Sequence, residues 1–393
     1  MTDHVTLRNV TTADREEVKK LWIECFDDTP EFVQWYYQRY YRDSYGIGVF
    51  DGSRLLASAQ VIPYRISLRE KEIDTGYVVG VDTTKEARHR GYARMLLGEC
   101  LKKQRMENRP ISLLMPFEGQ FYYRYGWPFC YFHQQIKVHP SELRCASCSY
   151  GTVREADPAL ERDALAEIYD CFISRYEGAV SRKKENWRNL LEDTALEESQ
   201  YFLLEGTFGK EAYCICTKIE NQWMIREFAW KNADAKAGML WFLQHWKAEE
   251  EVLWLELPED DALSEQLAVS KTAAVRYPFL MARIVDVKQC LEAFSYPNGN
   301  QRMGLKVTDL FAPWNHGVFY LELKNQKMTV TKAKEDMPAD AEISIEALSQ
   351  LVMGFKGADR LVQEGSLKVE GKKSVETLMR LWPEKRTYIN EYY

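Results

Sequence analysis

Apolar residues follow two different periods along the first third of the chain. Four stretches are rich in β-branched and aliphatic residues and have the length of strands. They cover residues 5–10, 46–50, 55–66 and 111–115. A longer stretch of the same kind runs through Val81, and Asp51-Gly52 between two apolar runs predicts a hairpin turn. The pattern therefore predicts a sheet in this part of the chain.

Helical spacing separates these strands. Residues 13–26 place apolar side chains at helical spacing after Thr12, and Thr29-Pro30 opens a second, aromatic-rich helix. Two further helices are expected at residues 91–107 and 121–125. Closing strands are expected at residues 127–138. Alternating strands and helices indicate an α/β (α+β) fold.

The segment between the long strand and the next helix carries the most specific signal. Its turn has the form Arg88-x-x-Gly91-x-Ala93, with small residues where the helix begins. The first N–H groups of a helix have no intrahelical partner, and the helix dipole is positive there. Small residues let a pyrophosphate reach these groups, and nearby basic side chains add charge. The basic side chains are those of Arg88, His89, Arg90 and Arg94.

The middle third repeats the order strand, helix, strand. Apolar periodicity predicts a helix over 233–247 and a strand over 252–257. The segment before the helix, 231–236, has no Arg-x-x-Gly pattern and contains Asp234. We therefore predict a second domain of the same kind without its phosphate turn. An unrelated α/β domain is the alternative.

The last hundred residues change character near Asp286. Helices and strands of short length predict a small α/β unit there. The helices are expected at 287–294, 343–353 and 374–381, and the strands at 317–323 and 327–331.

Composition narrows the classes of partner. The 393 residues suggest two to three domains, and 52 basic against 59 acidic residues give a formal charge of −7. That charge argues against nucleic acid and fits a cationic substrate. No apolar run approaches the ~20 residues of a membrane span, and the first residues lack signal-peptide character. We expect a cytoplasmic protein with no membrane partner.

The nine cysteines do not predict a metal site. Cys145-x-x-Cys148 and Cys214-x-Cys216 are the close pairs, and no second CxxC or HxxxH pair accompanies them. We expect no metal and reduced thiols, with a structural or redox-active metal as the alternative.

A second motif follows the strand at 111–115. It reads Phe117-Glu118-Gly119-Gln120-Phe121-Tyr122-Tyr123-Arg124-Tyr125-Gly126-Trp127. With the Arg88-x-x-Gly91-x-Ala93 turn placed between a strand and a helix, the order of elements resembles the GNAT N-acetyltransferase superfamily. The second motif is similar to the segment around the catalytic tyrosine of the enhanced intracellular survival (Eis) acetyltransferases. The resemblance extends over the whole chain, through its length, order of domains and aromatic C-terminus.

The resemblance implies tandem GNAT acetyltransferase folds, the second degenerate, followed by a sterol carrier protein-like α/β domain. The three domains would span residues 1–145, 146–285 and 286–393. Acetyl-CoA would be the cofactor, and the protein would be a homo-oligomer, a hexamer in that family. We expect a structural role for the last domain, because a fold does not establish lipid binding.

The resemblance also assigns cofactor contacts. Backbone groups of Val81 and Thr83 would hold the pantetheine arm like an added strand, and the Val81 N–H would polarise the thioester carbonyl. Phe117 and Glu118 would contact the pantetheine side. The remaining cofactor-binding residues would be Asp82, Arg88, His89, Arg90, Gly91, Tyr92, Ala93 and Arg94.

Two catalytic residues are implied in the same way. Tyr122 would protonate the leaving thiolate, with Tyr123 as its substitute, since a thiol pKa near ~8.5 and a phenol pKa near ~10 are close enough for this transfer. The carboxylate of the C-terminal Tyr393 would be the base, aided by desolvation or a water relay. Packing roles for the tyrosines and a frayed chain end are the structural alternatives.

Acids and aromatic residues near the second helix suggest an acceptor pocket. Asp27, Asp28, Trp35 and Tyr36 are suited to a polycationic amine, with a helix cap and core aromatics as the structural alternative. We therefore predict an acetyl-CoA-dependent N-acetyltransferase for primary amines of an aminoglycoside- or polyamine-like small molecule. A protein-lysine acetyltransferase, and a non-catalytic lipid or small-molecule carrier that uses the C-terminal domain, are the alternatives.

Overall fold

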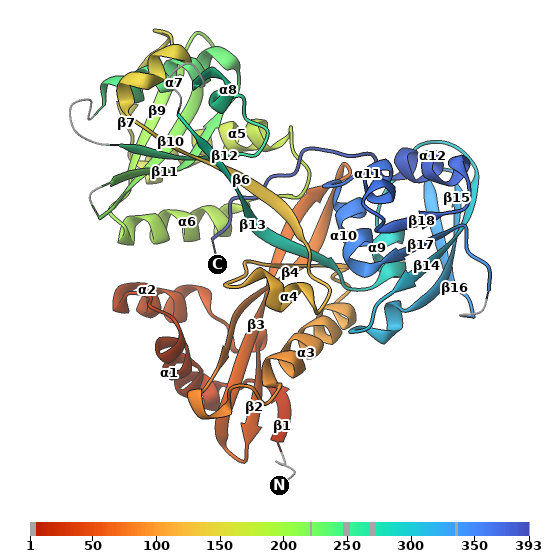
Figure 1. The fold of residues 1–393 in the computed structure, drawn as a ribbon. Coiled ribbons are helices and arrows are strands. Elements are labelled where there is room, and N and C mark those ends of the chain that lie inside the picture. The colour runs from red at the N-terminus through yellow and green to blue at the C-terminus, as the bar shows by residue number, and fades with distance from the viewer. Residues whose placement is uncertain (1–4, 221, 247–251, 268–271, 335–336, 393) are drawn as a thin grey trace. The chain divides into compact units, whose positions relative to one another are not determined.

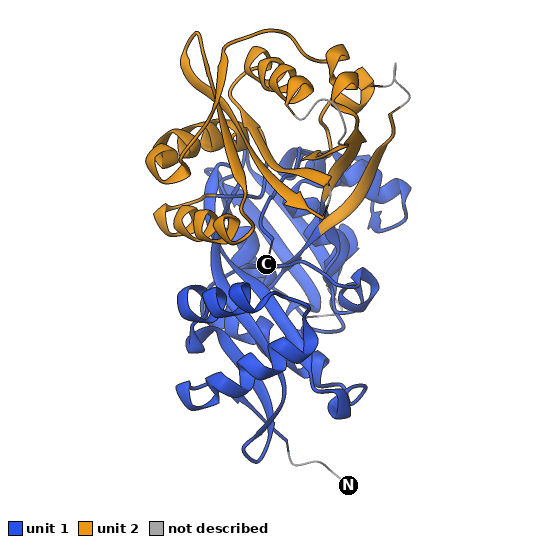
Figure 2. Cartoon of the chain, turned by 90° about the vertical axis from the view of Figure 1, so that its left-hand side faces the viewer, with its two compact units in different colours: residues 1–131, 177–180, 280–393 blue, residues 132–176, 181–279 orange. Residues whose placement is uncertain are grey.

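The computed structural model describes residues 5–220, 222–246, 252–267, 272–334 and 337–392. The chain divides into two compact units (Figure 2). Unit 1 comprises residues 1–131, 177–180 and 280–393, and unit 2 comprises residues 132–176 and 181–279. Unit 1 thus combines the first and last parts of the chain, and unit 2 is inserted between them in sequence.

The first five strands of unit 1 are neighbours in one sheet (Figure 1). They are β1 (Val5–Asn9), β2 (Gly46–Asp51), β3 (Arg54–Leu68), β4 (Lys71–Thr83) and β5 (Ile111–Leu114). The strands lie in chain order, antiparallel except for the parallel pair β4 and β5. The hairpin predicted at Asp51-Gly52 is confirmed, because Asp51 pairs with Arg54 and Gly52 has a φ of 58°.

Helices of this sheet follow the predicted order. Their bounds are η1 (Thr12–Asp14), α1 (Arg15–Cys25), α2 (Pro30–Trp35), η3 (Asp43–Tyr45), η4 (Lys85–Ala87), α3 (Tyr92–Met106) and α4 (Gly119–Tyr123). Helix α3 buries Leu96, Leu97 and Leu101 in one core with Val61 of β3 and Val78 of β4. This packing fixes the start of α3 beside the end of β4.

The second predicted helix changes its winding halfway. Helix α2 continues as a π-helical turn, η2 (Tyr36–Tyr40), in which the Tyr41 N–H donates to the Tyr36 carbonyl at 2.7 Å. The wider turn allows Tyr36, Tyr37 and Tyr40 all to be buried.

A second sheet of unit 1 lies in the C-terminal part of the chain. Its order is β16-β15-β14-β17-β18, formed by Lys327–Lys332, Gly317–Lys324, Gln301–Thr308, Ala341–Ser344 and Leu367–Val369. Its helices are α9 (Val287–Glu292), η7 (Pro313–Asn315), α10 (Ile345–Met353), α11 (Ala358–Gln363) and α12 (Lys372–Leu381). The helix predicted from residue 343 begins at Ile345, because the Ser344 side chain caps it by accepting a hydrogen bond from Ala347 N–H.

The β3–β4 hairpin reaches this C-terminal part. Arg69 at the hairpin turn donates to the carbonyls of Leu351 and Val352, at 3.2 and 3.0 Å. These carbonyls belong to the last turn of α10, whose carbonyls lack intrahelical partners. The Arg69 side chain therefore caps α10.

In unit 2, neighbouring strands follow the order β12-β11-β10-β9-β7. These strands are Leu253–Pro258, Gln222–Trp230, Gly209–Ile219, Gln200–Gly206 and Thr152–Glu155. Its helices are η5 (Pro140–Cys145), α5 (Pro158–Ile173), α6 (Lys184–Leu196), α7 (Ala233–His245) and α8 (Leu263–Leu267). Three strands complete the fold. They are β6 (Phe129–Val138) and β13 (Ala274–Ile284), within which the unit boundaries fall, and β8 (Ala179–Val180), which pairs with β3.

The predicted strand–helix–strand repeat is present in unit 2. Strand β11, helix α7 and strand β12 follow one another, and β12 pairs parallel to β11 as β5 does to β4. The predicted end of the helix, at residue 247, lies outside the described residues. Within the described ranges, none of the helices has both the length and the apolar character required to cross a membrane.

Candidate acetyltransferase site

Strand β4 leaves its neighbour β5 before it ends. The parallel pairing runs from Thr75 opposite Ile111 to Val78 opposite Leu114, whereas β4 continues to Thr83. Past Val78, the strand neighbour of β4 in the described chain is β3 alone. One edge of β4 therefore offers backbone N–H and C=O groups to an added strand-like ligand.

A bulge in β4 lies at this divergence. Ser58 pairs with Asp82 while Gln60 pairs with Val79, so β4 has one residue more than β3 here. Gly80 has a φ of 58°, and a Cβ at this position would lie 2.5 Å from the ring of Trp22. Glycine is therefore required, both by the backbone conformation and by the close approach of the indole.

Asp82 fixes the bulge from inside the sheet. Its carboxylate accepts hydrogen bonds from the Ser58 N–H at 2.9 Å and the Ser58 hydroxyl at 2.7 Å. The residue is buried, and its Oδ2 has no hydrogen-bond partner within the described residues. Burial raises the pKa of Asp82 to about 8, although the hydrogen bonds from Ser58 act in the opposite direction.

The phosphate-type turn has the backbone that its sequence predicts. His89 and Gly91 have φ values of 63° and 83°, and α3 begins directly afterwards. A Cβ added at Gly91 would meet no atom within 4 Å, so the backbone is open on that side. Arg88, His89, Arg90 and Arg94 are exposed around it, whereas Tyr92 points into the core and anchors the helix.

A pocket of about 200 Å³ lies beside the divergent part of β4. Strand β4, helix α1, the aromatic helix and the segment after β5 all contribute side chains. The predicted site residues that line it are Asp28, Tyr36, Val81, Phe117 and Tyr122. Sequence reasoning missed the others, which resemble ordinary core residues; they are Trp22, Phe26, Phe32, Val78, Val79, Gly80 and Met115.

Tyr122 and Tyr123 differ in environment. Tyr122 is 4% exposed and lines the pocket, whereas Tyr123 is 53% exposed and does not. Burial, and to a smaller extent the Cys100 thiol, raises the pKa of Tyr122, which keeps its hydroxyl protonated. The short helix α4 therefore presents Tyr122 to the pocket.

The acidic residues of the acceptor region, Asp27 and Asp28, are both exposed but differ in their contacts. Asp28 accepts a hydrogen bond from the Trp22 indole N–H at 2.7 Å and lines the pocket. Asp27 is exposed and is not among the lining residues, and Trp35 packs against Phe32 and Tyr40. Glu118 and Thr83 also lie outside the lining residues.

The C-terminal segment is anchored to the N-terminal sheet. The Thr387 hydroxyl donates to the Cys130 carbonyl at 2.8 Å, and the Tyr77 hydroxyl donates to the Glu391 carbonyl at 3.1 Å. Residues 388–391 are buried. Tyr77 directly precedes Val78, which lines the pocket. Tyr393 itself lies outside the described residues.

Comparisons with known proteins agree with this geometry. Residues 6–130 match the family model of the acetyltransferase (GNAT) domain, and residues 287–390 match that of the sterol carrier protein domain. A search of curated proteins gave no match.

Solved structures with a similar fold cover the chain almost completely. A probable N-acyltransferase from Enterococcus faecalis is 19% identical with a TM-score of 0.87, covering 99% of this chain and 100% of its own. A GCN5-related N-acetyltransferase from Anabaena variabilis is 17% identical with a TM-score of 0.86 and the same coverage. Eis1 from Mycobacterium abscessus is 16% identical with a TM-score of 0.78, again covering 99% and 100%.

The predicted GNAT acetyltransferase domain and the predicted fold class are thereby confirmed. Residues 6–130 form a GNAT acetyltransferase domain, the enzyme uses acetyl-CoA, and a sterol carrier protein domain follows at 287–390. The whole chain has the same fold as these solved structures.

The raised pKa of Asp82 predicts a pH dependence of stability. The Asp82 carboxyl group ionises near pH ~4 in the unfolded chain and near pH 8 in the folded chain. The folded state therefore binds more protons between these two pH values. Stability from Asp82 is therefore complete below pH ~4 and falls as the pH rises towards 8. We expect Asp82→Asn to flatten this fall by more than ~1.4 kcal/mol, the equivalent of one pKa unit.

Urea unfolding of both proteins at pH 5 to 8.5 measures the effect. Asp74→Asn, on an exposed part of the same strand, is the matched control and should keep the slope of the native protein. Parallel stability curves for the native protein and Asp82→Asn would contradict the assignment.

Proposed function

We propose that this GNAT enzyme acetylates a primary amine of a small cationic acceptor, aminoglycoside- or polyamine-like, with Tyr122 as the general acid. The observation that carries the proposal is the convergence of the open stretch of β4, the Tyr122 side chain and the Asp28 carboxylate on one pocket. Bound acetyl-CoA supplies the acetyl thioester, whose C–S bond breaks as the amine nitrogen bonds to the carbonyl carbon.

The cofactor contacts follow from the backbone of β4 and α3. Backbone groups of Val81 and Thr83 hold the pantetheine arm, and the Val81 N–H donates to the thioester carbonyl, which stabilises negative charge on that oxygen. Residues 88–94 hold the pyrophosphate through the first N–H groups of α3 and the basic side chains around them. The open backbone at Gly91 supports this placement. Phe117 and Glu118 lie beside the pantetheine. Asp82 contributes indirectly, because its hydrogen bond with Ser58 holds the bulge in β4.

Tyr122 donates its hydroxyl proton to the thiolate as it leaves. The pocket suits this step because burial keeps the hydroxyl protonated until negative charge develops on sulfur. The proton of the attacking amine passes to a base. We propose the carboxylate of Tyr393, since Glu391, two residues earlier in the chain, is hydrogen-bonded to Tyr77 of β4.

Asp28 and the aromatic rings select the acceptor. A carboxylate beside Trp22 and Tyr36 favours a second positive charge on the acceptor, through ion pairing and cation–π attraction. Asp27 and Trp35 contribute to the shape of this region rather than to its lining. A protein lysine presents only one amine on its side chain, so the need for a second charge separates the two acceptor classes.

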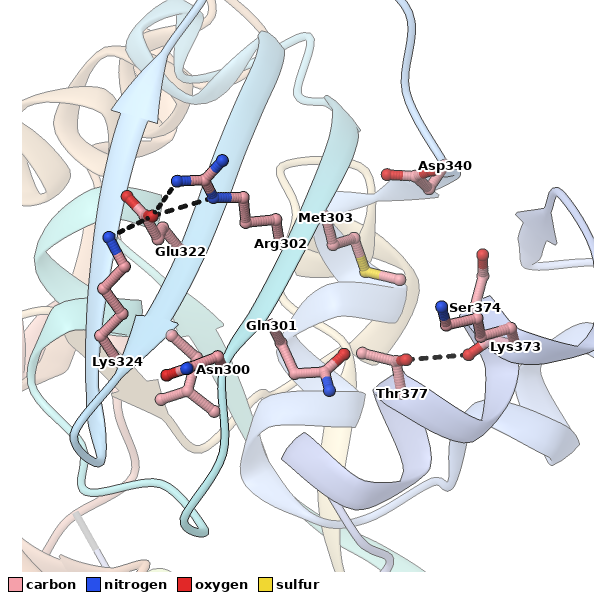
Figure 3. Close-up of a pocket in the computed structure, with 11 residues that line it drawn as sticks. Asn300, Gln301, Arg302, Met303, Glu322, Lys324, Asp340, Lys373, Ser374 and Thr377 are labelled. Carbon is pink, nitrogen blue, oxygen red and sulfur yellow. Dashed lines mark hydrogen bonds and ion pairs between the residues drawn. The ribbon is translucent and has the colours of Figure 1, made fainter.

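The carrier alternative finds little support in the C-terminal domain. A cavity of about 540 Å³ lies there, and most of its lining residues are polar or charged, with Met303 and Leu323 as the apolar ones (Figure 3). Glu322 forms ion pairs with Arg302 at 2.7 Å and with Lys324 at 2.8 Å. A lipid tail requires a predominantly apolar lining, and charged groups such as these are unfavourable beside it.

The remaining features of the proposal come from the family resemblance. Domain bounds of 1–145, 146–285 and 286–393, a homo-hexamer and a cytoplasmic location stay predictions. Limited proteolysis with mass spectrometry, light scattering and cell fractionation respectively test them.

The first prediction from this proposal concerns Tyr122→Phe, which removes only the hydroxyl. We expect turnover to fall by roughly 10²–10⁴ because the leaving thiolate loses its acid. Acetyl-CoA binding should be retained, because the phenyl ring keeps the packing. Steady-state kinetics and calorimetry measure the two quantities.

Tyr123→Phe is the matched control, since Tyr123 is exposed, and it should turn over normally. Gly91→Asp, unlike Tyr122→Phe, should abolish acetyl-CoA binding, because it places a negative charge at the phosphate turn. Normal turnover of Tyr122→Phe would remove Tyr122 from the mechanism, and normal binding by folded Gly91→Asp would move the phosphate site elsewhere.

The second prediction tests the acceptor. Asp28→Asn should raise KM for a diamine about tenfold, since a tenfold change corresponds to about 1.4 kcal/mol of binding. An acceptor of equal length, with a hydroxyl in place of the second amine, should be little affected. Asp27→Asn is the control and should change neither value. An equal effect on both acceptors would show that Asp28 does not select for charge.

The third prediction concerns the chain end. A short peptide appended after Tyr393 converts its carboxylate to an amide, and deletion of Tyr393 moves the carboxylate by one residue. Both changes should lower turnover, by on the order of 10²-fold for loss of a base, while acetyl-CoA binding is kept. The same peptide at the N-terminus is the control. If the C-terminally extended protein turns over normally from pH 6 to 9, the base must be another group.

A further inference from the structure

A buried arginine joins the Tyr122 segment to the C-terminal domain. Arg283 lies in β13 and is fully buried. One end of its guanidinium, Nη1, donates to the Tyr125 carbonyl, and the other, Nη2, donates to Asp309 Oδ2 at 2.5 Å. These partners belong to the two parts of unit 1, the segment after α4 and the loop after β14.

The close approach of this guanidinium accounts for a glycine in the second sequence motif. Gly126 has a φ of 92°, and a Cβ at this position would lie 1.6 Å from Arg283 Nη1. No other residue can be accommodated without moving the guanidinium. The Tyr125-Gly126 step is therefore shaped by a residue more than 150 positions later in the chain.

Asp309 is itself held in one position. Its Oδ1 accepts hydrogen bonds from the N–H groups of Phe311 at 3.0 Å and Ala312 at 2.9 Å. Its Oδ2 accepts a further bond from the Asn315 side-chain amide at 3.1 Å. The carboxylate thus organises the loop 309–315 as well as pairing with Arg283, and the guanidinium has a fixed partner.

A line of aromatic rings runs from this loop to Tyr122. The ring centroid of Phe311 lies 4.8 Å from that of Tyr125, and Tyr125 contacts Phe121 edge to face at 5.5 Å. Phe121 contacts Tyr122 at 5.0 Å with perpendicular planes. The backbone follows the same route, because the Tyr122 carbonyl accepts the N–H groups of Tyr125 at 3.0 Å and Trp127 at 3.3 Å.

We propose that Arg283 and Asp309 are positioning residues for Tyr122, so that the sterol carrier protein domain serves acetyl transfer by holding the acid helix. This inference rests on the proposed role of Tyr122. Helix α4 has five residues, and a helix this short does not keep its own orientation. The Tyr125 carbonyl, fixed by the guanidinium, sets where the helix ends and therefore where the Tyr122 hydroxyl points. Neither Arg283 nor Asp309 lines the pocket or touches the reacting groups.

Conservative variants test this without removing the buried partners. Arg283→Lys keeps the charge and loses the two-ended donor geometry, and Asp309→Asn keeps an acceptor and loses the charge. Phe311→Leu leaves the ion pair intact and removes the ring contact with Tyr125. It is therefore the substitute test variant if Arg283→Lys or Asp309→Asn does not fold. Arg105→Gln is the matched control, because Arg105 pairs with Asp286 at 2.7 Å and does not contact the Tyr122 segment.

We expect each test variant that folds to lower kcat at least tenfold while KM for acetyl-CoA stays within twofold. The same substitutions made in Tyr122→Phe should lower kcat less than twofold further, because no hydroxyl remains to be positioned. Arg105→Gln should leave kcat and KM unchanged. Thermal unfolding at the assay temperature confirms that each protein is folded.

Three results are distinguishable. Normal kcat in a folded Arg283→Lys or Phe311→Leu protein would overturn the positioning role. An equal further fall in the Tyr122→Phe background would also overturn it, since the effect would then be general destabilisation. Normal turnover of Tyr122→Phe alone would instead overturn the proposed acid, whatever the other variants do.

Discussion

The site depends on the early end of the pairing between β4 and β5. If this ladder continued past Val78, the backbone groups of β4 would be satisfied and no cofactor arm could add to its edge. The bulge at Gly80 turns the strand at that point, and the Asp82–Ser58 hydrogen bonds hold the bulge from inside the sheet. Trp22 covers the glycine and forms the wall of the pocket. One irregularity in a strand therefore creates the open edge and the pocket beside it.

The sequence predicted what periodicity and local motifs determine. It identified strands β1 to β5, the hairpin at Asp51-Gly52, helix α3 and the turn before it, because each depends on residues close together in the chain. It could not identify the bulge, since Val79-Gly80-Val81 reads as an uninterrupted strand and Ser58 lies 24 positions away from Asp82. Both Tyr122 and Tyr123 fall in one short helix, so only the packing of α4 decides which faces the pocket. The residues around Arg283 in the sequence do not predict its contacts, because its partners Tyr125 and Asp309 are distant in the chain.

The two strand–helix–strand units differ at the helix N-terminus. In the first, Gly91 leaves the start of α3 open. In the second, Asn232 caps α7 through the Ala235 N–H at 2.8 Å, and the Glu211 carboxylate accepts from the Asn232 side-chain amide at 2.5 Å. The position where a phosphate would lie is thus satisfied by the chain's own side chains, one of them anionic. The same order of elements therefore gives an open helix N-terminus in one case and a closed cap in the other.

The distant contacts of unit 1 also bear on the order in which the protein can mature during synthesis. The acetyltransferase segment leaves the ribosome first. However, the partner of Tyr77, Glu391, lies 314 positions later in the chain, and the partner of Tyr125, Arg283, lies 158 positions later. Contacts of such separation carry a large loop-closure entropy and form late in folding. A nascent or prematurely terminated chain would consequently contain β4 and α4 without the partners that hold Tyr77 and the Tyr125 carbonyl. The contacts that tie the first part of unit 1 to its last part are therefore completed only after the C-terminal residues have been translated.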